Sequence, residues 1–485
     1  MNESEKADIA VIGLAVMGQN LILNMNDHGY KVAAFNRTVS KVDDFLNGPA
    51  KGTNVVGANS LEELVSLLKR PRRIMLMVKA GEAVDETIGH ILPYLESGDI
   101  IIDGGNTLFT DTERRIDLVK SKGLHYIGTG ISGGEDGARH GPAIMPGGDP
   151  EAWPHLKDIF QSIAAKGIND QPCCDWIGNG GAGNYVKTVH NGIEYGDMQL
   201  ISETYALLKA IGLDNQQMSQ VFTDWNAGQL DSYLIEITSE ILAYKDEDGD
   251  FVIDKIVDSA GQKGTGKWTV ISGSDLGQPI SVIAEALFSR FTSSLLEERH
   301  KASLAYGELQ QIEVSNHTEL IEKIGKALYA SKIISYAQGY MLMKAAAKEY
   351  GWQINYSSVA GIWTGGCIIR SRFLGDIQNA YSKNPDLENL LLDDFFISAI
   401  KECEPAWRDV VALATKSGVP IPGLAAALSF FDSYRSRRLP ANLIQAQRDY
   451  FGAHTYERTD RLRNEFFHTN WTGEGGNITS SSYNA

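Results

Sequence analysis

The chain has 485 residues, which at about 150 residues per domain corresponds to two large domains or three ordinary ones. Its 44 basic and 61 acidic side chains give a formal net charge of −17, and such a negative field disfavours binding to nucleic acid or to anionic membranes. A composition of 43% hydrophobic and 22% charged residues is typical of a globular protein and excludes a disordered or fibrous one.

The cysteines and the apolar runs give no sign of a secreted or membrane protein. No run reaches the ~18 apolar residues that a membrane-spanning helix needs, and the polar first residues contain no apolar stretch of signal-peptide length. We therefore expect a soluble cytoplasmic protein. We expect neither a disulfide framework nor a metal site, because no Cys-x-x-Cys pair and no histidine at zinc-ligand spacing accompanies Cys173, Cys174, Cys367 and Cys403.

Residues 1–180 are predicted to form a Rossmann-type α/β domain. The first apolar run leads into Gly13-Leu14-Ala15-Val16-Met17-Gly18, a Gly-x-Ala-x-x-Gly variant of the dinucleotide fingerprint. Its small residues let the backbone approach a pyrophosphate at a helix N-terminus. Helical stretches separate four runs with the fully apolar character of parallel strands covered on both faces: Ile9–Ile12, Val32–Phe35, Ile74–Val78 and Ile100–Ile102.

The residues that follow the later apolar runs indicate which dinucleotide binds. Where NAD enzymes usually have an acidic residue for the ribose 2′-hydroxyl, this chain has Asn36-Arg37-Thr38. An arginine beside a hydroxyl suits the 2′-phosphate of NADP, although an exposed surface arginine is the alternative. Val78-Lys79-Ala80 and Asn106 follow the third and fourth runs, at the strand ends where ligands bind in open α/β sheets.

Residues 181–438 are predicted to form a large all-helical domain, since the apolar periodicity from Asn184 to about Arg438 is helical. A weak internal echo suggests a duplicated helical unit. In that echo Lys187, His190, Asn191 and Glu194 of the first copy correspond to Leu328, Ser331, Lys332 and Ser335 of the second. Residues 439–485 contain a short predicted helix and a Gly/Ser/Asn-rich end, and we expect them to be a C-terminal tail.

The segment from Lys187 to Tyr195 is the most informative. Offsets of three, four and seven residues place His190, Asn191 and Glu194 on the same helix face as Lys187, over about 10.5 Å. A solvated, salt-bridged face is the usual explanation for such a pattern. Gly180, Gly181, Gly183 and Gly192 are poor residues for a plain solvent-facing helix, because interior glycine costs ~1 kcal/mol, so the spacing favours a functional site.

A second glycine-rich segment, Gly261 to Lys267, matches the Gly-x4-Gly-Lys pattern of a P-loop. The next residue is Trp268 instead of the Ser or Thr that would bind Mg²⁺, and no apolar strand precedes the segment. We expect a loop that binds another anion through its lysines and not a nucleoside triphosphate.

Six segments, in order and spacing, resemble the decarboxylating 6-phosphogluconate dehydrogenases over essentially the whole chain: Gly13–Gln19, Asn36–Thr38, Ile131–Gly134, Lys187–Asp197, Lys263–Trp268 and Leu439–Thr455. The resemblance implies a Rossmann-type domain, an all-helical domain and a tail that enters the partner's site in a homodimer. It also implies NADP-dependent oxidative decarboxylation of 6-phosphogluconate to ribulose 5-phosphate.

The same resemblance implies roles for single residues. Lys187 would be the general base and Glu194 the acid, with no metal. Burial should lower the pKa of Lys187 and an anionic substrate should raise it, and the sequence leaves open which prevails. The carboxylate and hydroxyl end of the substrate would be held by Asn106, Ser132, Gly133, Gly134, His190 and Asn191. Its phosphate would be held by Tyr195, Lys263, Arg290, Arg448 and His454.

The chain departs from the family pattern at two positions. Asn184 stands where the family typically has His, and Thr364 where it often has Arg. Asn184 precedes Lys187 by about one helical turn, so it could change how the base responds to pH. The alternatives to this family are a β-hydroxyacid dehydrogenase for a smaller substrate and an inactive NADP-binding scaffold.

Overall fold

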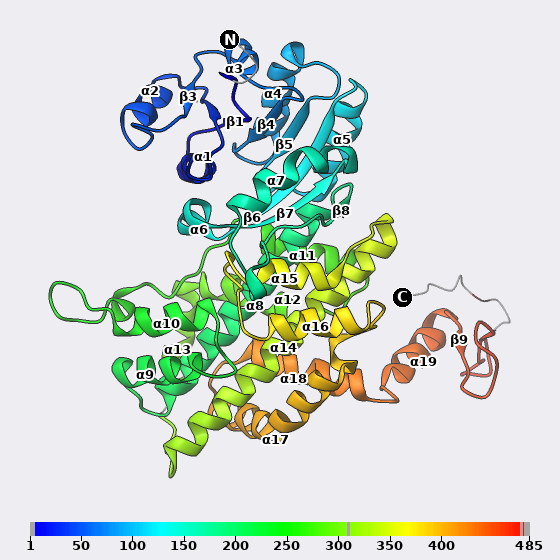
Figure 1. Cartoon of the computed structure of the whole chain (residues 1–485). Coiled ribbons are helices and arrows are strands. Elements are labelled where there is room, and N and C mark those ends of the chain that lie inside the picture. The colour runs from blue at the N-terminus through cyan, green and yellow to red at the C-terminus, as the bar shows by residue number, and fades with distance from the viewer. Residues whose placement is uncertain (1–4, 308–310, 476–478, 480–485) are drawn as a thin grey trace. The chain divides into compact units, whose positions relative to one another are not determined.

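The computed structural model describes residues 5–307, 311–475 and 479 (Figure 1). The chain divides into two compact units, Met1–Ala427 and Leu428–Ala485, which are described separately.

The first unit opens with an eight-stranded sheet in the order β3-β2-β1-β4-β5-β6-β7-β8. Its strands are β1 (Ile9–Ile12), β2 (Val32–Phe35), β3 (Val56–Gly57), β4 (Arg73–Leu76), β5 (Ile100–Asp103), β6 (His125–Ser132), β7 (Ala143–Gly148) and β8 (Gly178–Asn179). The four strands expected from apolar runs are β1, β2, β4 and β5, and they pair in parallel. The sheet is not wholly parallel as expected, because β7 runs antiparallel to β6. The short connection between these two strands suits an antiparallel pair.

Helices cover both faces of this sheet. Side chains alternate along β1, so Ile9 and Val11 join one core with Leu21 of α1, whereas Ala10 joins another with Ile88 of α4. These two layers confirm a Rossmann-type arrangement. The helices of this part are α1 (Val16–Asp27), α2 (Ser40–Asn47), α3 (Leu61–Ser66), α4 (Glu82–Ile91), α5 (Phe109–Lys120), α6 (Gly134–His140) and α7 (Trp153–Ile163), with 3₁₀ turns η2 (Leu92–Tyr94), η3 (Pro150–Ala152) and η4 (Ile168–Asp170).

The remainder of the first unit is helical, as expected. Two long helices, α8 (Ala182–Ala210) and α14 (His317–Tyr350), pack along each other (Figure 1). They approach closely at Gly196, where an added Cβ would lie 2.4 Å from Ser335 Oγ. The other helical elements of this unit are α9 (Asn215–Asn226), α10 (Tyr233–Ala243), η5 (Val252–Lys255), α11 (Thr265–Asp275), α12 (Ser281–Ser293), α13 (Leu296–Tyr306), α15 (Tyr356–Trp363), α16 (Leu374–Lys383), η6 (Leu390–Leu392) and α17 (Asp394–Ser417). Helix α18 (Pro422–Arg435) begins in the first unit and ends in the second.

The second unit is organised around one buried carboxylate. Beyond the end of α18 it contains α19 (Ala441–Gly452) and the antiparallel pair β9 (Tyr456–Glu457) and β10 (Phe466–Phe467). Asp449, which is fully buried, accepts hydrogen bonds from Thr455 N, Thr469 N and Trp471 Nε1. Its other close partner is the His468 ring, at 2.9 Å. One side chain thus ties the helix to the segments that follow it.

Across the described ranges 5–307 and 311–475, no helix combines the length and apolar character required to cross a bilayer.

Candidate functional site

A cavity of about 690 Å³ opens at the carboxyl ends of β1, β2 and β4. Ligands bind at this edge in open α/β sheets. Of the residues predicted to bind the cofactor, those that line it are Gly13, Leu14, Ala15, Asn36, Arg37, Thr38, Val78 and Lys79. The other predicted residues, which are not part of this lining, are Val16, Met17, Gly18, Ala80 and Asn106.

The shape of this cavity depends on the glycine-rich turn. Gly13 has φ +111°, and a Cβ on it would lie 2.4 Å from Met77 O. A Cβ on Gly18 would lie 2.0 Å from Gly13 O, so both positions need glycine for the turn to form beside β4. Asn36 Oδ1 accepts a hydrogen bond from Leu14 N at 3.1 Å, which joins the turn to the end of β2.

The cavity is also lined by side chains that were not predicted from the sequence. Lys41, on α2, lies four residues after Arg37 and adds a second cation to the same wall. Glu86, Thr87 and His90 come from α4. Lys41 follows Arg37 by only four residues, and this nearness in the sequence was a usable signal. Nothing local marked the α4 residues, because α4 reaches the cavity only through tertiary packing.

The second candidate site is carried by α8, which lies directly on β6. Two glycines of β6 permit this contact. A Cβ on Gly130 would lie 2.3 Å from Lys187 Cβ, and one on Gly128 would lie 2.0 Å from Asn184 Oδ1. The helix therefore sits close enough for Lys187 to be buried, with only 6% of its surface exposed.

The predicted polar stripe of α8 forms a connected group centred on His190, which is fully buried. His190 Nδ1 lies 3.3 Å from Lys187 Nζ and 3.2 Å from Asn191 Oδ1, and its Nε2 lies 3.3 Å from Ser132 Oγ. Glu194 Oε2 lies 3.8 Å from His190 Nδ1. The structure thus brings together four α8 residues and the last residue of β6, as the spacing and the family resemblance predicted.

Burial shifts the pKa values of Lys187 and Glu194 in opposite directions. It lowers the pKa of Lys187, against the charges of Glu194 and Cys367. Burial raises the pKa of Glu194; the charges of Lys187 and Arg290 oppose that rise and Asp197 adds to it. Burial and the Lys187 charge hold the pKa of His190 well below its usual value. A lysine that loses its proton easily and a carboxyl group that retains one are a matched base and acid.

The turn after β6 lies against a distant loop. Gly133 is left-handed, with φ +117°, and a Cβ on it would lie 2.6 Å from Gly366 O. Gly134, with φ +63°, begins α6. Gly366 O also accepts a hydrogen bond from Ala143 N at 2.8 Å. The loop after α15, which sequence reasoning did not connect with the site, therefore forms one of its walls. Asn106 lies exposed in the turn after β5.

The residues expected at the substrate phosphate are only partly brought together. The Arg290 guanidinium lies 3.7 Å from the centre of the Tyr195 ring, a cation–π distance, and donates a hydrogen bond to Gly261 O. Lys263 is exposed in the coil before α11. The element before this coil is the 3₁₀ turn η5 and not a strand, which agrees with the rejection of a P-loop.

The two phosphate ligands expected in the tail belong to the second unit. Arg448 Nη1 donates a hydrogen bond to Gln445 Oε1 at 3.1 Å. The His454 ring lies edge-on to Phe451, with ring centres 6.0 Å apart.

The two departures from the family pattern occupy defined places. Asn184 is buried, and its Oδ1 accepts a hydrogen bond from Thr112 at 2.8 Å, so its amide contacts α5. Thr364 Oγ1 donates a hydrogen bond to Gly361 O at 2.7 Å and accepts one from Ile168 N.

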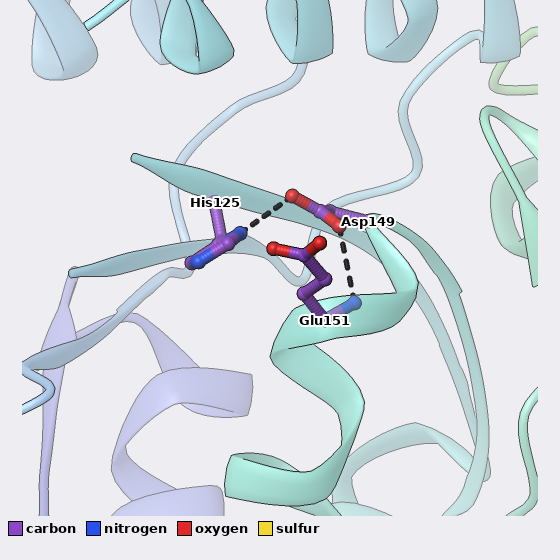
Figure 2. Close-up of side chains that lie close together, drawn as sticks. All are labelled: His125, Asp149 and Glu151. Atoms are coloured by element: carbon purple, nitrogen blue, oxygen red, sulfur yellow. Dashed lines mark hydrogen bonds and ion pairs between the residues drawn. The ribbon is translucent and has the colours of Figure 1, made fainter. Parts of the chain in front are cut away.

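A possible group of metal ligands lies where β6 begins and β7 ends, at the strand ends away from the dinucleotide cavity. Figure 2 shows its three residues. The group comprises His125 at the start of β6, Asp149 after β7 and Glu151 in η3. Asp149 uses one carboxylate oxygen to contact His125 Nδ1, at 2.5 Å, and the other to accept a hydrogen bond from Glu151 N, which caps η3. Local hydrogen bonding therefore accounts for this cluster. The four cysteines are buried free thiols.

Comparison with known proteins identifies one family that matches both parts of the chain. Residues 8–178 match the model of the NAD binding domain of 6-phosphogluconate dehydrogenase, and residues 183–471 match that of its C-terminal domain. The decarboxylating 6-phosphogluconate dehydrogenase of Rattus norvegicus is 60% identical, and that of Haemophilus influenzae 57%; each alignment covers 99% of this chain and at least 99% of the relative.

A solved structure is similar over nearly the same length. The Plasmodium falciparum 6-phosphogluconate dehydrogenase, described in apo form and with NADP+ or 6-phosphogluconate, superposes with a TM-score of 0.93. It is 47% identical, and the match covers 96% of this chain and 100% of that one. With both of its parts matched by family models and its whole length matched by relatives, the chain belongs to the 6-phosphogluconate dehydrogenase family.

Proposed function

We propose that this chain catalyses the NADP-dependent oxidative decarboxylation of 6-phosphogluconate to ribulose 5-phosphate and CO2. The observation that carries the proposal is the pair Lys187 and Glu194 on one face of α8, with pKa values shifted toward each other by burial. Family membership and a structural relative described with NADP+ and 6-phosphogluconate support it.

Lys187 acts first in this scheme, as the general base. Its neutral amine takes the proton of the substrate 3-hydroxyl while the C3–H bond breaks. Bound NADP would supply the acceptor for that hydride. Burial lowers the pKa of Lys187, which makes its proton easier to lose and supports this role. The amine can return its proton to the C3 oxygen later, when negative charge develops there.

Glu194 acts last, as the general acid. The 3-keto acid loses CO2 by breaking its C1–C2 bond, and the electrons pass to the C3 carbonyl to give an enediol. The former C2, which becomes C1 of the product, then needs a proton. Glu194 supplies it, since burial keeps this carboxyl group protonated to a higher pH than an exposed glutamate. No step in this scheme requires a metal.

The remaining side chains orient the two ends of the substrate. We assign the carboxylate and hydroxyl end to the residues around the fully buried His190, where donors from β6 and α8 already converge. This set is Asn106, Ser132, Gly133, Gly134, His190 and Asn191. We assign the phosphate to the cations near Tyr195 and to the tail, because phosphate is bound best by fixed Arg and Lys donors. That set is Tyr195, Lys263, Arg290, Arg448 and His454.

The cavity on the sheet suits NADP. A pyrophosphate fits the glycine-rich turn at the N-terminus of α1, and the wall that carries Arg37, Thr38 and Lys41 offers two cations and a hydroxyl for a 2′-phosphate. Among the described lining residues that follow β2, none has a carboxylate that could bind the free ribose 2′-hydroxyl of NAD.

We also infer a cytoplasmic homodimer in which residues 439–485 complete the partner's site. The supporting observation is the second unit's own surface, since α19 exposes four large apolar side chains. Exposed apolar groups at this density are typical of a surface that another chain covers. The side chains are Leu443, Ile444, Tyr450 and Phe451, with exposed fractions of 60–73%. In this scheme residues 1–180 form the NADP-binding domain, which also contributes substrate-binding residues up to Gly134. Residues 181–438 form the substrate and dimerisation domain.

The test compares 6-phosphogluconate with gluconate as substrates for NADP reduction, with trapped CO2 measured in parallel. We expect NADPH and CO2 in equal amounts from 6-phosphogluconate and very little of either from gluconate. Oxidation that does not depend on the phosphate would instead indicate a β-hydroxyacid dehydrogenase. NADP binding without turnover would indicate a scaffold, and either result would refute the proposal.

A further inference from the structure

A buried ion pair joins the site helix α8 to α14. Lys332 Nζ lies 2.7 Å from Asp197 Oδ2, and each side chain is only 1% exposed. Asp197 lies three residues after Glu194, so it belongs to the same stretch of α8 as the proposed acid. Breaking such a buried pair leaves an uncompensated charge, so the pair strongly resists a change in how the two helices pack.

A tyrosine extends this pair to a third segment. Tyr336, one helical turn after Lys332 on α14, is fully buried. Its hydroxyl lies 3.1 Å from Asp197 Oδ2 and 3.0 Å from Ile369 O, and shares its single proton between these two acceptors. Burial and the Asp197 charge hold the pKa of Tyr336 well above its usual value, so the hydroxyl remains a donor.

The two acceptors of this hydroxyl belong to two segments that contribute to the proposed catalytic site. Asp197 lies on the helix that carries Lys187 and Glu194. Ile369 belongs to the loop after α15, in which Gly366 O lies against the Gly133 turn. The same loop carries Cys367, whose thiol is close enough to Lys187 and Glu194 to interact with them electrostatically. The Tyr336 hydroxyl is thus a bridge between the acid–base helix and the loop that supports the substrate turn.

We propose that Tyr336, held by the Asp197–Lys332 ion pair, is a positioning residue for the reaction carried by Lys187 and Glu194. This inference rests on the proposed function. The hydroxyl fixes the distance between helix and loop, and a proton transfer is sensitive to displacements well below 1 Å. The dinucleotide cavity, which is built from β1, β2 and β4, is not part of this bridge.

Tyr336→Phe tests the bridge, because it removes one oxygen and leaves the ion pair intact. We expect kcat with 6-phosphogluconate to fall about ten-fold or more, because the reacting groups lose their alignment. The KM for NADP should stay within about two-fold of the wild-type value, because the cofactor cavity is unchanged. Activity is expressed per NADP-binding site, so that unfolded protein does not count.

Tyr340→Phe is the matched control. Tyr340 lies one turn further along α14, is equally buried, and has a hydroxyl with no hydrogen-bond partner among the described residues. We expect its kcat to match wild type. Lys332→Met, which unpairs Asp197 but keeps the hydroxyl, should lower kcat in the same direction as Tyr336→Phe.

Equal kcat values for Tyr336→Phe and Tyr340→Phe would overturn the inference and leave Tyr336 with a purely structural role. An unchanged kcat for Lys332→Met would overturn the part assigned to the ion pair. Failure of the proposed function is distinguishable, because the wild-type enzyme itself would then produce no NADPH from 6-phosphogluconate.

Discussion

Among single residues, the proposed chemistry depends on Lys187 and Glu194, whose pKa values burial shifts in opposite directions. Lys187 and Glu194 are seven residues apart in the sequence, so a straight helix presents them on one face. Their separation is a matter of helix geometry. Their pKa values depend instead on the side chains and backbone that surround them, because desolvation penalises the charged form of each group.

Lys187→Met should nearly abolish turnover. The substitution keeps the length of the side chain but removes the amine, so the 3-hydroxyl proton has no acceptor. We expect kcat to fall by about 10²–10⁴-fold, the range for a general base, with little change in the KM for NADP. Initial rates of NADPH formation measure the change, and circular dichroism verifies the fold. Near-normal kcat in a folded variant would reject Lys187 as the base.

Arg37→Leu should weaken NADP binding selectively. Arg37 lines the cavity at the end of β2, and a charge-assisted hydrogen bond to phosphate contributes about 1.5–3 kcal/mol, or roughly 10–150-fold in affinity. We expect the KM for NADP to rise by that order. The control is the rate with NAD, which has no 2′-phosphate and should change little. An equal loss with both cofactors would place Arg37 outside the 2′-phosphate site.

At the scale of secondary-structure elements, the site depends on how closely α8 approaches β6. The strand offers glycine at the two positions under the helix, and no side chain could occupy either without displacing it. The sequence predicted the α8 stripe from its periodicity. The sequence did not predict β6, because this strand, His-Tyr-Ile-Gly-Thr-Gly-Ile-Ser, has fewer of the apolar residues by which β1 and β5 were recognised.

Gly130→Ala should therefore lower kcat by more than a loss of folding stability alone would explain. The new Cβ would lie 2.3 Å from Lys187 Cβ, so either the helix or the base must move. We expect kcat to fall about ten-fold or more, by misalignment of the base. Gly89→Ala on α4 is the control, because its Cβ meets nothing within 4 Å and a helical alanine should slightly raise the melting temperature. Unaltered kcat in Gly130→Ala would contradict the close-packing argument.

The junction of α8 with α18 should make stability depend on pH near neutrality. Glu203 accepts hydrogen bonds from Gly423 N and Leu424 N, and burial raises its pKa to about 7. The folded state then binds a proton that an unfolded glutamate, with a pKa of 4.5, has already released. The contribution of Glu203 to stability is therefore complete below pH 4.5 and declines as pH rises through about 7.

Glu203→Gln tests this sign. The glutamine has no proton to lose, so its melting temperature relative to wild type should rise steadily between about pH 5 and pH 8. Thermal melts of both proteins over that range give the difference directly. A difference that is flat with pH, or that falls, would show that Glu203 is ionised throughout in the folded protein.

For the molecule as a whole, we propose that the second unit of another subunit completes the site. Arg448 and His454 are assigned to the phosphate, and both belong to the unit Leu428–Ala485. The buried Asp449 holds α19 and the following strands together, so this unit can present Arg448 as part of a defined surface. If tails are exchanged, one active site consists of residues from two chains.

Mixing two inactive variants tests this exchange. A heterodimer of full-length Lys187→Met and Arg448→Leu contains one intact site if each tail serves the partner, and no intact site if each tail serves its own subunit. We expect the separate homodimers to be nearly inactive and activity to reappear after the subunits are unfolded together and refolded. Persistent inactivity of a verified heterodimer would contradict tail exchange.

Local patterns in the sequence were enough to predict the strands β1, β2, β4 and β5, the glycine turn at Gly13 and the polar face of α8. Each rests on local spacing or on residue type, which the chain carries without its fold. Only the tertiary structure decided which groups are buried, and so the direction of the Lys187 and Glu194 pKa shifts. It also revealed the positions of Lys41, of the loop at Gly366 and of Tyr336. Desolvation and contact depend on neighbours that are distant in sequence, and local periodicity carries no information about them.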